Sequence, residues 1–475
     1  MNYLFDFDGT LITALQIDYV KLKNELKVIL ETDNEITPMV EKIREYSKIN
    51  NDDNNDNDND NNKIQIKITN CFNLIDKYEI EALIHSKINY KWLDLYLNSN
   101  KKIIVSRNGL KVIDKFFKDN NLPYPDYISC RDNSTELKPS IKQLDFLKSH
   151  NGLIINPDLS KDKSNLTLVG DSDIDSLLAK NYGISYLDVN NNKLIYIDIF
   201  IPFYNHNNDY HRTHLTKKIF KHYANIKKIL QDKAIISFTL LGSEKDISKK
   251  LAESYFPNLY YYEFNQDLIQ NDNRIYNDFN KMFEKKMNSG VSISISKNPN
   301  ILLCAGSNDY IPIKFFHDVI NFFKSDIPQV YGIDNFYNGC NCVYFAKYNT
   351  DKEEFINNNE IWWDGISNFC GREKYHYCGG IIGVNKNLLD NNAELLKTWG
   401  FDEGETERVA LNTKNVAKFN SKNLYFFNIK TINDKDLNTL SELNKVNLKK
   451  INIYSDIDEN TRQIILNDLE YYKSL

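Results

Sequence analysis

The sequence has no apolar run near the ~18 residues that a membrane-spanning helix needs, and Asp6 and Asp8 interrupt any secretory signal at its amino terminus. Cysteine is also scarce. The seven cysteines in 475 residues are an odd number, which fits reduced thiols better than a disulfide framework. These absences predict a soluble, cytoplasmic protein with no membrane span.

Basic residues are in the minority, with 59 Lys and Arg against 65 Asp and Glu, a net charge of −6 and a pI near 5.9. This balance argues against a nucleic-acid partner, because such binding needs a basic surface. The pattern G-x-x-x-x-G-K-[ST] is absent as well, which argues against the usual phosphate loop of nucleotide-dependent kinases. The length of 475 residues suits two or three domains.

The first stretch of the chain carries the strongest chemical signal. An apolar strand, Tyr3–Phe5, runs into Asp6 and Asp8, and Gly9-Thr10 follows. Alternate residues of a strand point to the same side, so the two carboxylates share a face at its carboxyl end. Such a pair either repels or jointly holds a cation, which predicts a site for a hard metal ion.

A second apolar strand, Lys102–Val105, ends at Ser106 and is followed by a helix over 110–119. Ser106 is expected to donate to a phosphoryl oxygen, and a helix-capping role is compatible with that. Arg107 and Asn108 come next and are expected substrate contacts. Lys138 lies just before Pro139, where a cation would balance clustered acids.

A later strand, Leu166–Gly170, again runs into acids. Asp171 and Asp175 are four residues apart and therefore share one face of the following helical turn. Together these strand ends supply a nucleophilic carboxylate, a second acid, a hydroxyl donor, a lysine and another acidic pair. That set suits phosphoryl transfer through an aspartyl phosphate, with Mg²⁺ neutralising the charge.

The segment between the first two strands has a helical pattern over 16–31, 38–46 and 75–97. Because these helices fall between strands of one sheet, they predict an inserted cap, spanning about 14–98. Residues 50–62 are almost purely Asn and Asp, which predicts a disordered loop within the cap.

In order and spacing, these motifs resemble the haloacid dehalogenase-like (HAD) hydrolase superfamily over residues 1–190. The resemblance implies that Asp6 attacks phosphorus, that Asp8 is the acid–base catalyst, and that Ser106 and Lys138 hold the phosphoryl group. It also implies Mg²⁺ bound by Asp6, the Asp8 carbonyl and Asp171, with Asp175 in support. An acid at position 8 points to a phosphatase or a phosphomutase.

After a polar break at 190–193, strands and helices alternate again. Strands are expected over 194–200, 234–241, 260–264, 300–304 and 375–384, and helices over 210–230, 247–255, 274–288, 314–323 and 386–399. The alternation of the first three strands and helices, over 194–288, predicts a second parallel sheet, and the whole domain is expected to span 191–475.

The second half carries five short motifs in order, Ile201–Asn205, Gly242-Ser243, Ser307–Pro312, Gly379-Gly380 and Phe401–Glu407. In this order they resemble a GT-A-fold, family-2-like glycosyltransferase over about residues 194–412. The resemblance implies a nucleotide-sugar donor, an acceptor, and Mn²⁺ or Mg²⁺ at Asp309. It makes Glu405 the base, with Glu403 and Glu407 as alternatives. Separately, the large paired indoles of Trp362 and Trp363 predict either a sugar-stacking platform or core. The remaining expected substrate contacts are Pro202, Tyr204, Gly242, Ser243, Asn308, Gly379 and Gly380. Ser307-Asn308-Asp309 has one carboxylate where the family's D-x-D has two.

The expected fold class is therefore α/β: a Rossmann-like HAD domain with a helical cap after its first strand, then a GT-A-like domain. The expected function is a bifunctional enzyme, a Mg²⁺ phosphatase of a sugar phosphate or nucleotide fused to a nucleotide-sugar transferase. The alternative is a phosphatase or phosphomutase fused to a non-catalytic substrate-binding module.

Overall fold

The computed structural model describes residues 2–52, 58–146, 148–149, 163–192, 194–203, 210–242, 245–256, 260–263, 289–290, 292–294, 296–324, 335–339, 342–356, 360–365, 382–384, 416–418, 425–431 and 448–475. The chain divides into two compact units, Met1–Asn192 and Lys193–Leu475. The division lies two residues from the expected boundary. Among the described residues, no helix is both long and apolar enough to cross a membrane.

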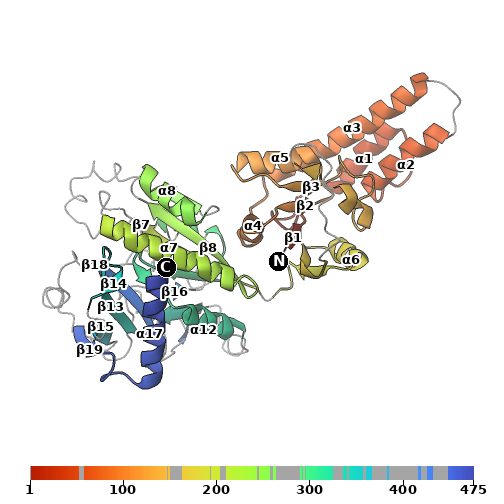
Figure 1. The fold of residues 1–475 in the computed structure, drawn as a ribbon. Coiled ribbons are helices and arrows are strands. Elements are labelled where there is room, and N and C mark those ends of the chain that lie inside the picture. Colours follow the sequence, from red (N-terminus) through yellow and green to blue (C-terminus); the bar gives the residue numbers. More distant parts are fainter. Residues whose placement is uncertain are drawn as a thin grey trace. The chain divides into compact units, whose positions relative to one another are not determined.

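The first unit is built on a six-stranded sheet in the order β4-β3-β2-β1-β5-β6. All neighbours are parallel except β3 and β4. The strands are β1 (Asn2–Phe5), β2 (Ile103–Val105), β3 (Tyr127–Ser129), β4 (Lys148–Ser149), β5 (Leu166–Gly170) and β6 (Ser185–Asp188). This is the doubly wound α/β architecture expected from the sequence, with β1 inside the sheet (Figure 1).

Helices cover both faces of this sheet, and each face has its own apolar layer. Leu4, Leu168 and Leu178 belong to one core cluster, which includes the helix α6 (Asp173–Tyr182). On the opposite face, Phe5 packs edge-on against Tyr96 of α4 (Tyr90–Leu97), with ring centroids 5.5 Å apart. The helix α5 (Leu110–Asp119) lies on that side too, because its Phe117 contacts Tyr96. Alternation along buried parallel strands places these layers.

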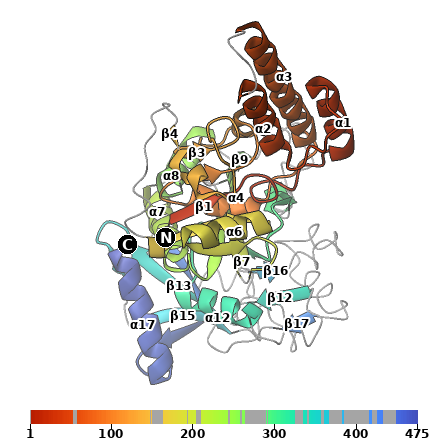
Figure 2. The same cartoon turned by 90° about the vertical axis from the view of Figure 1, so that its right-hand side faces the viewer.

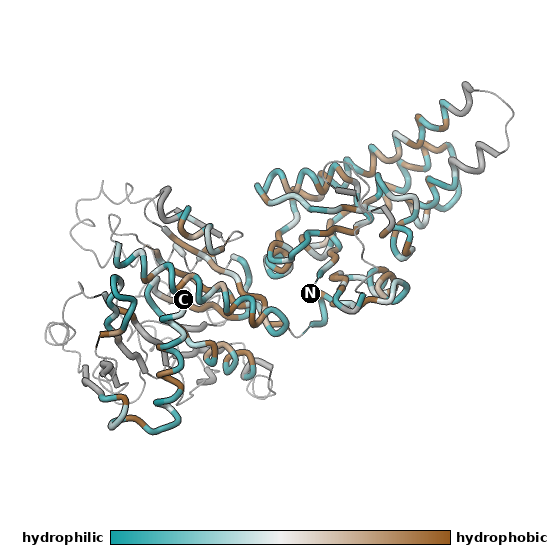
Figure 3. The backbone as a smooth tube through the Cα atoms, in the orientation of Figure 1, coloured by the Kyte–Doolittle hydropathy of each residue, from teal (hydrophilic) through white to brown (hydrophobic). Residues whose placement is uncertain are grey.

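Three helices of the segment between β1 and β2 form a bundle with its own core. They are α1 (Tyr19–Leu30), α2 (Met39–Asp52) and α3 (Asp58–Leu83), and they lie side by side in both views (Figures 1 and 2). Leu22, Leu26 and Ile75 are in their shared cluster, and brown and teal alternate along all three helices (Figure 3). The expected cap segment thus contains a bundle of three helices, whereas α4 packs on the sheet.

The expected disordered loop over 50–62 is helical at both ends. The helix α2 continues to Asp52 and α3 begins at Asp58, while residues 53–57 lie outside the described part of the chain. Once a helix is nucleated by a packed segment, adding residues to it costs little. The polar composition alone therefore misplaced the boundaries of both helices.

The second unit contains two sheets. The larger has the order β17-β12-β16-β10-β7-β8-β9, with β7 (Ile195–Phe203), β8 (Ala234–Gly242), β9 (Tyr260–Glu263), β10 (Ile301–Cys304), β12 (Asn335–Gly339), β16 (Ile382–Val384) and β17 (Val416–Lys418). The strands β7, β8, β9 and β10 are parallel, as expected. The strand β16, however, is antiparallel to β10 and β12. The parallel sheet expected from the strand–helix alternation is thus present, and it is extended by β16 and β12, whose pairing that alternation does not specify.

The other sheet was not expected from the sequence. It runs β11-β18-β13-β15-β19, and β14 pairs with β13. Its strands are β11 (Asp309–Tyr310), β13 (Cys342–Asn349), β14 (Glu354–Phe355), β15 (Glu360–Gly365), β18 (Tyr425–Thr431) and β19 (Leu448–Asn452).

Four helices of the second unit are bounded as α7 (Tyr210–Ile229), α8 (Lys245–Tyr255), α12 (Ile313–Lys324) and α17 (Glu459–Ser474). All four contribute to one core with β7, β8 and β10. The C-terminal helix α17 enters that core through Ile465, Leu469 and Tyr472. The helices expected over 274–288 and 386–399 lie outside the described residues.

Candidate active site

The carboxyl ends of β1, β2 and β5 bring the expected motifs of the first unit to one edge of the sheet. The amide of Asp6 donates to the Val169 carbonyl (2.9 Å), so the ladder between β1 and β5 continues to the first acid. Ser106 donates its amide to the Ser129 carbonyl (2.9 Å) in the same way. Asp171 directly follows β5. Parallel neighbours end at the same edge, which is where open α/β sheets bind ligands.

Lys138 lies between two of the acids. Its Nζ is 2.7 Å from Asp6 Oδ1 and 2.6 Å from Asp175 Oδ1, and its side chain is 2% exposed. Burial lowers the pKa of Lys138, but Asp6 and Asp175 together outweigh this, so its pKa is raised. The lysine is therefore a fixed positive charge at the site, as the sequence predicts.

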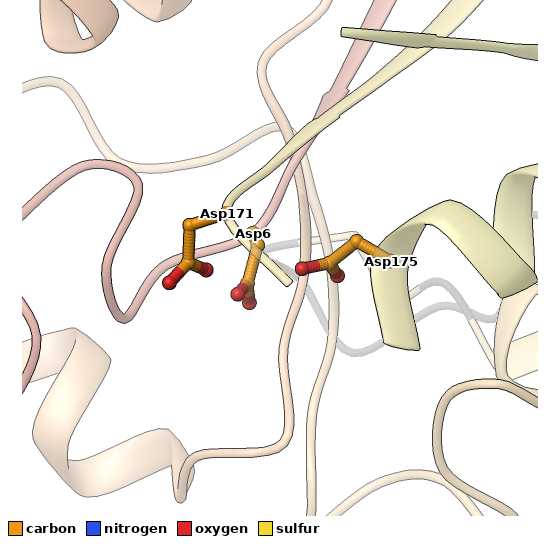
Figure 4. A group of neighbouring side chains, drawn as sticks. All are labelled: Asp6, Asp171 and Asp175. Atoms are coloured by element: carbon orange, nitrogen blue, oxygen red, sulfur yellow. The ribbon is translucent and has the colours of Figure 1, made fainter. Parts of the chain in front are cut away.

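Asp6, Asp171 and Asp175 form a group whose carboxylate oxygens lie within 4.8 Å of one another. Figure 4 shows Asp6 between the other two. Burial raises the pKa of Asp6 against the pull of Lys138. Burial, aided by Asp175, raises the pKa of Asp171 to about 6. Clustered acids that resist ionisation in this way favour a bound cation.

Gly9 makes room for this acid group. Its φ is +76°, a conformation that costs other residues energy. A Cβ atom at position 9 would overlap the carboxylate of Asp171. The glycine after the first acidic pair is thus required by space as well as by backbone conformation.

Asp8 has a partner outside the group of three acids. Its Oδ1 accepts a hydrogen bond from the Leu15 amide at 2.7 Å. Burial raises the pKa of Asp8, while the Leu15 hydrogen bond lowers it. Among the described residues, the metal-capable group does not include the Asp8 carboxylate. Proton transfer by that carboxylate and coordination by the Asp8 carbonyl both stay predictions.

Asp175 is fixed by the start of α6. Ser172 caps the helix, and each side chain of the Ser172–Asp175 pair accepts from the other's backbone in a capping box. Ser172 Oγ also donates to Asp175 Oδ2 at 2.6 Å, and Lys138 takes the other oxygen. Because both oxygens have protein partners, Asp175 serves mainly to orient Lys138.

Ser106 donates its hydroxyl to Asn108 Oδ1 at 2.8 Å, and the Asn108 amide donates back to Ser106 Oγ (3.2 Å). The buried Gln143 holds this loop in place, since its Nε2 donates to the Ser106 carbonyl (2.7 Å) and its Oε1 accepts from the Lys138 amide. Gln143 thereby links Ser106 to Lys138. Sequence reasoning missed Gln143, because an isolated glutamine in a 3₁₀ turn carries no pattern.

Arg107, an expected substrate contact, binds protein groups instead. Its Nη1 donates to the Lys138 carbonyl (2.7 Å), and its Nη2 lies 2.8 Å from Glu41 Oε1 of α2. Arg44, also on α2, donates to the carbonyls of Arg131 and Ser134. These contacts tie the cap bundle to the strand ends. They were not foreseen, because they join residues far apart in sequence.

In the second unit, three expected contact residues lie near the carboxyl ends of parallel strands. Pro202 and Gly242 are on β7 and β8, where Phe203 faces Gly242 in register. Asn308 follows β10, and its Nδ2 donates to the Ile429 carbonyl (3.0 Å). These three predicted contacts therefore lie at one edge of the sheet, and their role in binding a ligand stays a prediction.

Asp309, the expected metal ligand, directly follows Asn308 and begins β11. It is buried, and its Oδ2 accepts from the Gly306 amide at 2.6 Å within its own turn. Trp363 lies on β15 opposite Tyr344. The other expected residues, Tyr204, Ser243, Gly379, Gly380 and Glu405 with its alternatives Glu403 and Glu407, lie outside the described residues.

The described residues thus form two α/β units, the first with acid, serine and lysine side chains at the carboxyl edge of its sheet and the second with a sheet whose strands β7 to β10 are parallel. The sequence matches no protein-family model and no curated protein. Similar solved structures include hydrolases of the HAD superfamily and glycosyltransferases, the two families that the motifs resemble.

One of these structures is a HAD-superfamily hydrolase from Ehrlichia chaffeensis, with 18% identity and a TM-score of 0.21, covering 42% of this chain and 86% of that one. Another is the galactosyltransferase LgtC, with 10% identity, a TM-score of 0.23, and coverage of 47% and 73%. Mouse xyloside xylosyltransferase 1 has 7% identity, a TM-score of 0.23, and coverage of 45% and 76%. Likenesses this weak say nothing about activity, so a functional conclusion has to come from the site's own residues.

Proposed function

We propose that residues 1–192 form a phosphoric monoester hydrolase that works through a phosphorylated Asp6. The observation that carries this proposal is the buried Asp6 carboxylate, paired with Lys138 and grouped with Asp171 and Asp175 at the strand edge. A carboxylate nucleophile beside a fixed cation suits attack on a phosphate ester, whose oxygens need positive charge.

In the first step, an oxygen of Asp6 attacks phosphorus, and the bond between phosphorus and the ester oxygen breaks. Asp8 gives its proton to the leaving oxygen. Burial raises the pKa of Asp8, which favours the protonated form needed here. Lys138 remains charged and stabilises the negative charge on the phosphoryl oxygens.

In the second step, water loses a proton to the Asp8 carboxylate and attacks phosphorus. The bond between phosphorus and Asp6 breaks, and inorganic phosphate leaves. Asp6 is again a carboxylate and Asp8 again carries a proton, so the cycle closes with one water consumed. The same residue acts as acid and then as base, as in other two-step hydrolyses.

The acid group fits Mg²⁺. It offers oxygen donors alone, and the lack of a side chain at Gly9 lets the Asp171 carboxylate lie close to the backbone there. The three carboxylates of the group have one lysine beside them, which leaves negative charge for a cation to balance. Asp6, the Asp8 carbonyl and Asp171 would hold the ion, with Asp175 in support. When bound, it would supply positive charge next to the phosphoryl oxygens.

The test is phosphate release by the full chain from an aryl phosphate and from panels of sugar phosphates and nucleotides, with Mg²⁺ or with a chelator. Hydrolysis should require Mg²⁺ and be abolished in Asp6→Asn. Asp173→Asn is the matched control, because Asp173 is an exposed acid of the same region. Activity retained in Asp6→Asn would contradict the proposal. A bisphosphate requirement without net phosphate release would indicate a phosphomutase instead.

For residues 193–475 we infer a nucleotide-sugar-dependent transferase. Support comes from the parallel strands β7, β8 and β10, which bring Pro202, Gly242 and Asn308 to one edge, the usual place for a ligand in such sheets. One carboxylate oxygen of Asp309 already accepts a hydrogen bond from the Gly306 amide. We therefore expect donor binding that does not depend on a metal at Asp309.

Thermal-shift titrations of the full chain with UDP- and GDP-sugars, with Mn²⁺ or with a chelator, test this inference. A ligand at 100 times its Kd should add about 2.7 kcal/mol to the unfolding free energy. Stabilisation by a nucleotide sugar in the presence of chelator is the expected result. If no nucleotide sugar stabilises the chain, the second unit is better explained as a non-catalytic substrate-binding module.

A further inference from the structure

A buried ionic cluster joins the cap bundle to the loop after β2, and no step of the proposed reaction uses it. Arg131, which follows β3, pairs through Nη2 with Asp76 and through Nη1 with Glu79 (2.9 Å). Both acids are on α3, and the Arg131 side chain is 1% exposed. Buried charges persist only when they are paired and hydrogen-bonded. The cluster therefore fixes α3 against the segment that contains Arg131.

Glu79 has partners beyond the arginine. Its Oε1 accepts from Asn108 Nδ2 at 3.2 Å, and its Oε2 accepts from the Gly109 amide at 3.2 Å. Both oxygens of Glu79 thus accept hydrogen bonds from the loop that follows β2 and contains Ser106. An ionised carboxylate is acceptor-only, so it matches three donors that converge on it.

Asn108 connects Glu79 to Ser106, the expected phosphoryl-binding hydroxyl, and to Asp8, the acid–base residue of the proposed reaction. Its Oδ1 accepts from Ser106 Oγ at 2.8 Å, and its side chain lies near enough to Asp8 to lower the pKa of that carboxyl. A side-chain amide has an acceptor oxygen and a donor nitrogen. The oxygen of Asn108 faces Ser106 and its nitrogen faces Glu79, so Asn108 has a single orientation.

Gly109 is required for the approach of α3. Its φ is −73°, open to any residue, yet a Cβ atom there would overlap Arg131 Nη2 and Asp76 Oδ1. The loop thus lies directly against the ionic cluster, with no space between them for a side chain.

We propose that Glu79 is a positioning residue of the hydrolysis: it orients Asn108, which in turn aims the Asp8 carboxyl and the Ser106 hydroxyl. The helix α3 of the cap thereby sets the geometry of the proton donor. This inference rests on the proposed phosphatase function and adds a residue to it.

Glu79→Gln is the direct test. Glutamine has one acceptor oxygen and presents an NH₂ group to the remaining donors, so Asn108 loses its fixed orientation. The effect should depend on the leaving group. An alkyl phosphate needs protonation of its leaving oxygen, whereas an aryl phosphate with an acidic phenol does not. We expect kcat/KM to fall about 100-fold for the alkyl ester and no more than about threefold for the aryl ester.

Asp76→Asn is the matched control. It weakens the same cluster through Arg131 but touches a different part of the loop from Asn108. It should lower the melting temperature without changing the ratio of the two kcat/KM values. Asn108→Ala should reproduce the leaving-group dependence of Glu79→Gln, and the double variant should be no worse than either single one.

Equal losses of kcat/KM for both esters in Glu79→Gln, or additive losses in the double variant, would overturn the positioning role. They would leave the phosphatase proposal intact. If Glu79→Gln does not fold, the leaving-group dependence of Asn108→Ala decides in the same way. A wild-type chain that hydrolyses neither ester would overturn the proposed function and this inference together.

Discussion

Lys138 Nζ lies 2.7 Å from Asp6 Oδ1, and both side chains are buried. The same ammonium group is 2.6 Å from Asp175 Oδ1. Asp175 is 37 positions from the lysine in the sequence, and Asp6 is farther still, so both contacts exist only in the folded unit. The same positive charge therefore has two roles. It would hold a phosphoryl group, and it offsets the cost of burying two carboxylates.

Replacing Lys138 with Met should therefore lower the unfolding free energy by about 3–5 kcal/mol, the usual cost of leaving a buried charge unpaired. Adding Asp175→Asn should recover part of the loss, with a coupling energy of about 1 kcal/mol or more. Denaturant titrations of the full chain measure both. Phosphate release should stay abolished in the double variant, and additive stabilities would argue against the pairing.

Gly9 and Gly183 offer a matched comparison. Their φ values are +76° and +78°, so alanine at either position should cost roughly 1 kcal/mol of stability. Only at position 9 would the new Cβ overlap Asp171, since nothing lies within 4 Å of a Cβ at position 183. Gly9→Ala should lose phosphatase activity and Gly183→Ala should keep it. Equal activities in the two variants would contradict a spatial role for Gly9.

Mg²⁺ should stabilise the chain through the acid group. At 100 times its Kd the ion should add about 2.7 kcal/mol to the unfolding free energy. The stabilisation should disappear in Asp171→Asn and persist in Asp8→Asn, since only the first carboxylate belongs to the metal-capable group. Thermal shift with and without chelator measures this. A response that survives Asp171→Asn would place the ion elsewhere.

The buried His222 predicts a pH dependence in the second unit. Its Nε2 donates to the Ile311 carbonyl (2.7 Å), and its ring stacks on Tyr310 at 4.2 Å between centroids. Burial lowers the pKa of His222 to about 4. The unfolded chain takes up the proton near the ordinary pKa of about 6.5, so stability falls as pH drops from there toward 4.

Between pH 7 and pH 5 this should cost about 2 kcal/mol of unfolding free energy. His222→Gln keeps a donor for the Ile311 carbonyl and cannot titrate, so it should flatten that part of the pH profile. Denaturant titrations at the two pH values provide the measurement. An unchanged slope in His222→Gln would assign the pH dependence to other groups.

Local patterns were enough to predict the motifs of the first unit. Asp6, Ser106 and Asp171 each follow an apolar strand, and parallel strands must end at one edge. Lys138 does not follow a strand, and only its position between the other motifs suggested a role for it. Glu79 and Arg131 could not be found in this way, since they are 52 residues apart and their significance lies in meeting each other and Asn108.

The second unit shows the same limit at the level of the fold. The strands β7 to β10 follow from strand–helix alternation, but β13 pairs in parallel with β18, about eighty residues later. No local periodicity specifies such a partner. Asp309 illustrates the consequence at a site: its sequence context suggests a metal ligand, yet the Gly306 amide takes its carboxylate oxygen.

Direct detection of the phosphorylated nucleophile tests the central claim. In Asp8→Asn, an aryl phosphate needs no protonation of its leaving group, while water lacks its base, so the intermediate should accumulate. After acid quench and digestion, mass spectrometry should find one phosphoryl group on the peptide containing Asp6. Phosphate released with no label on that peptide, or a label on another residue, would contradict the mechanism.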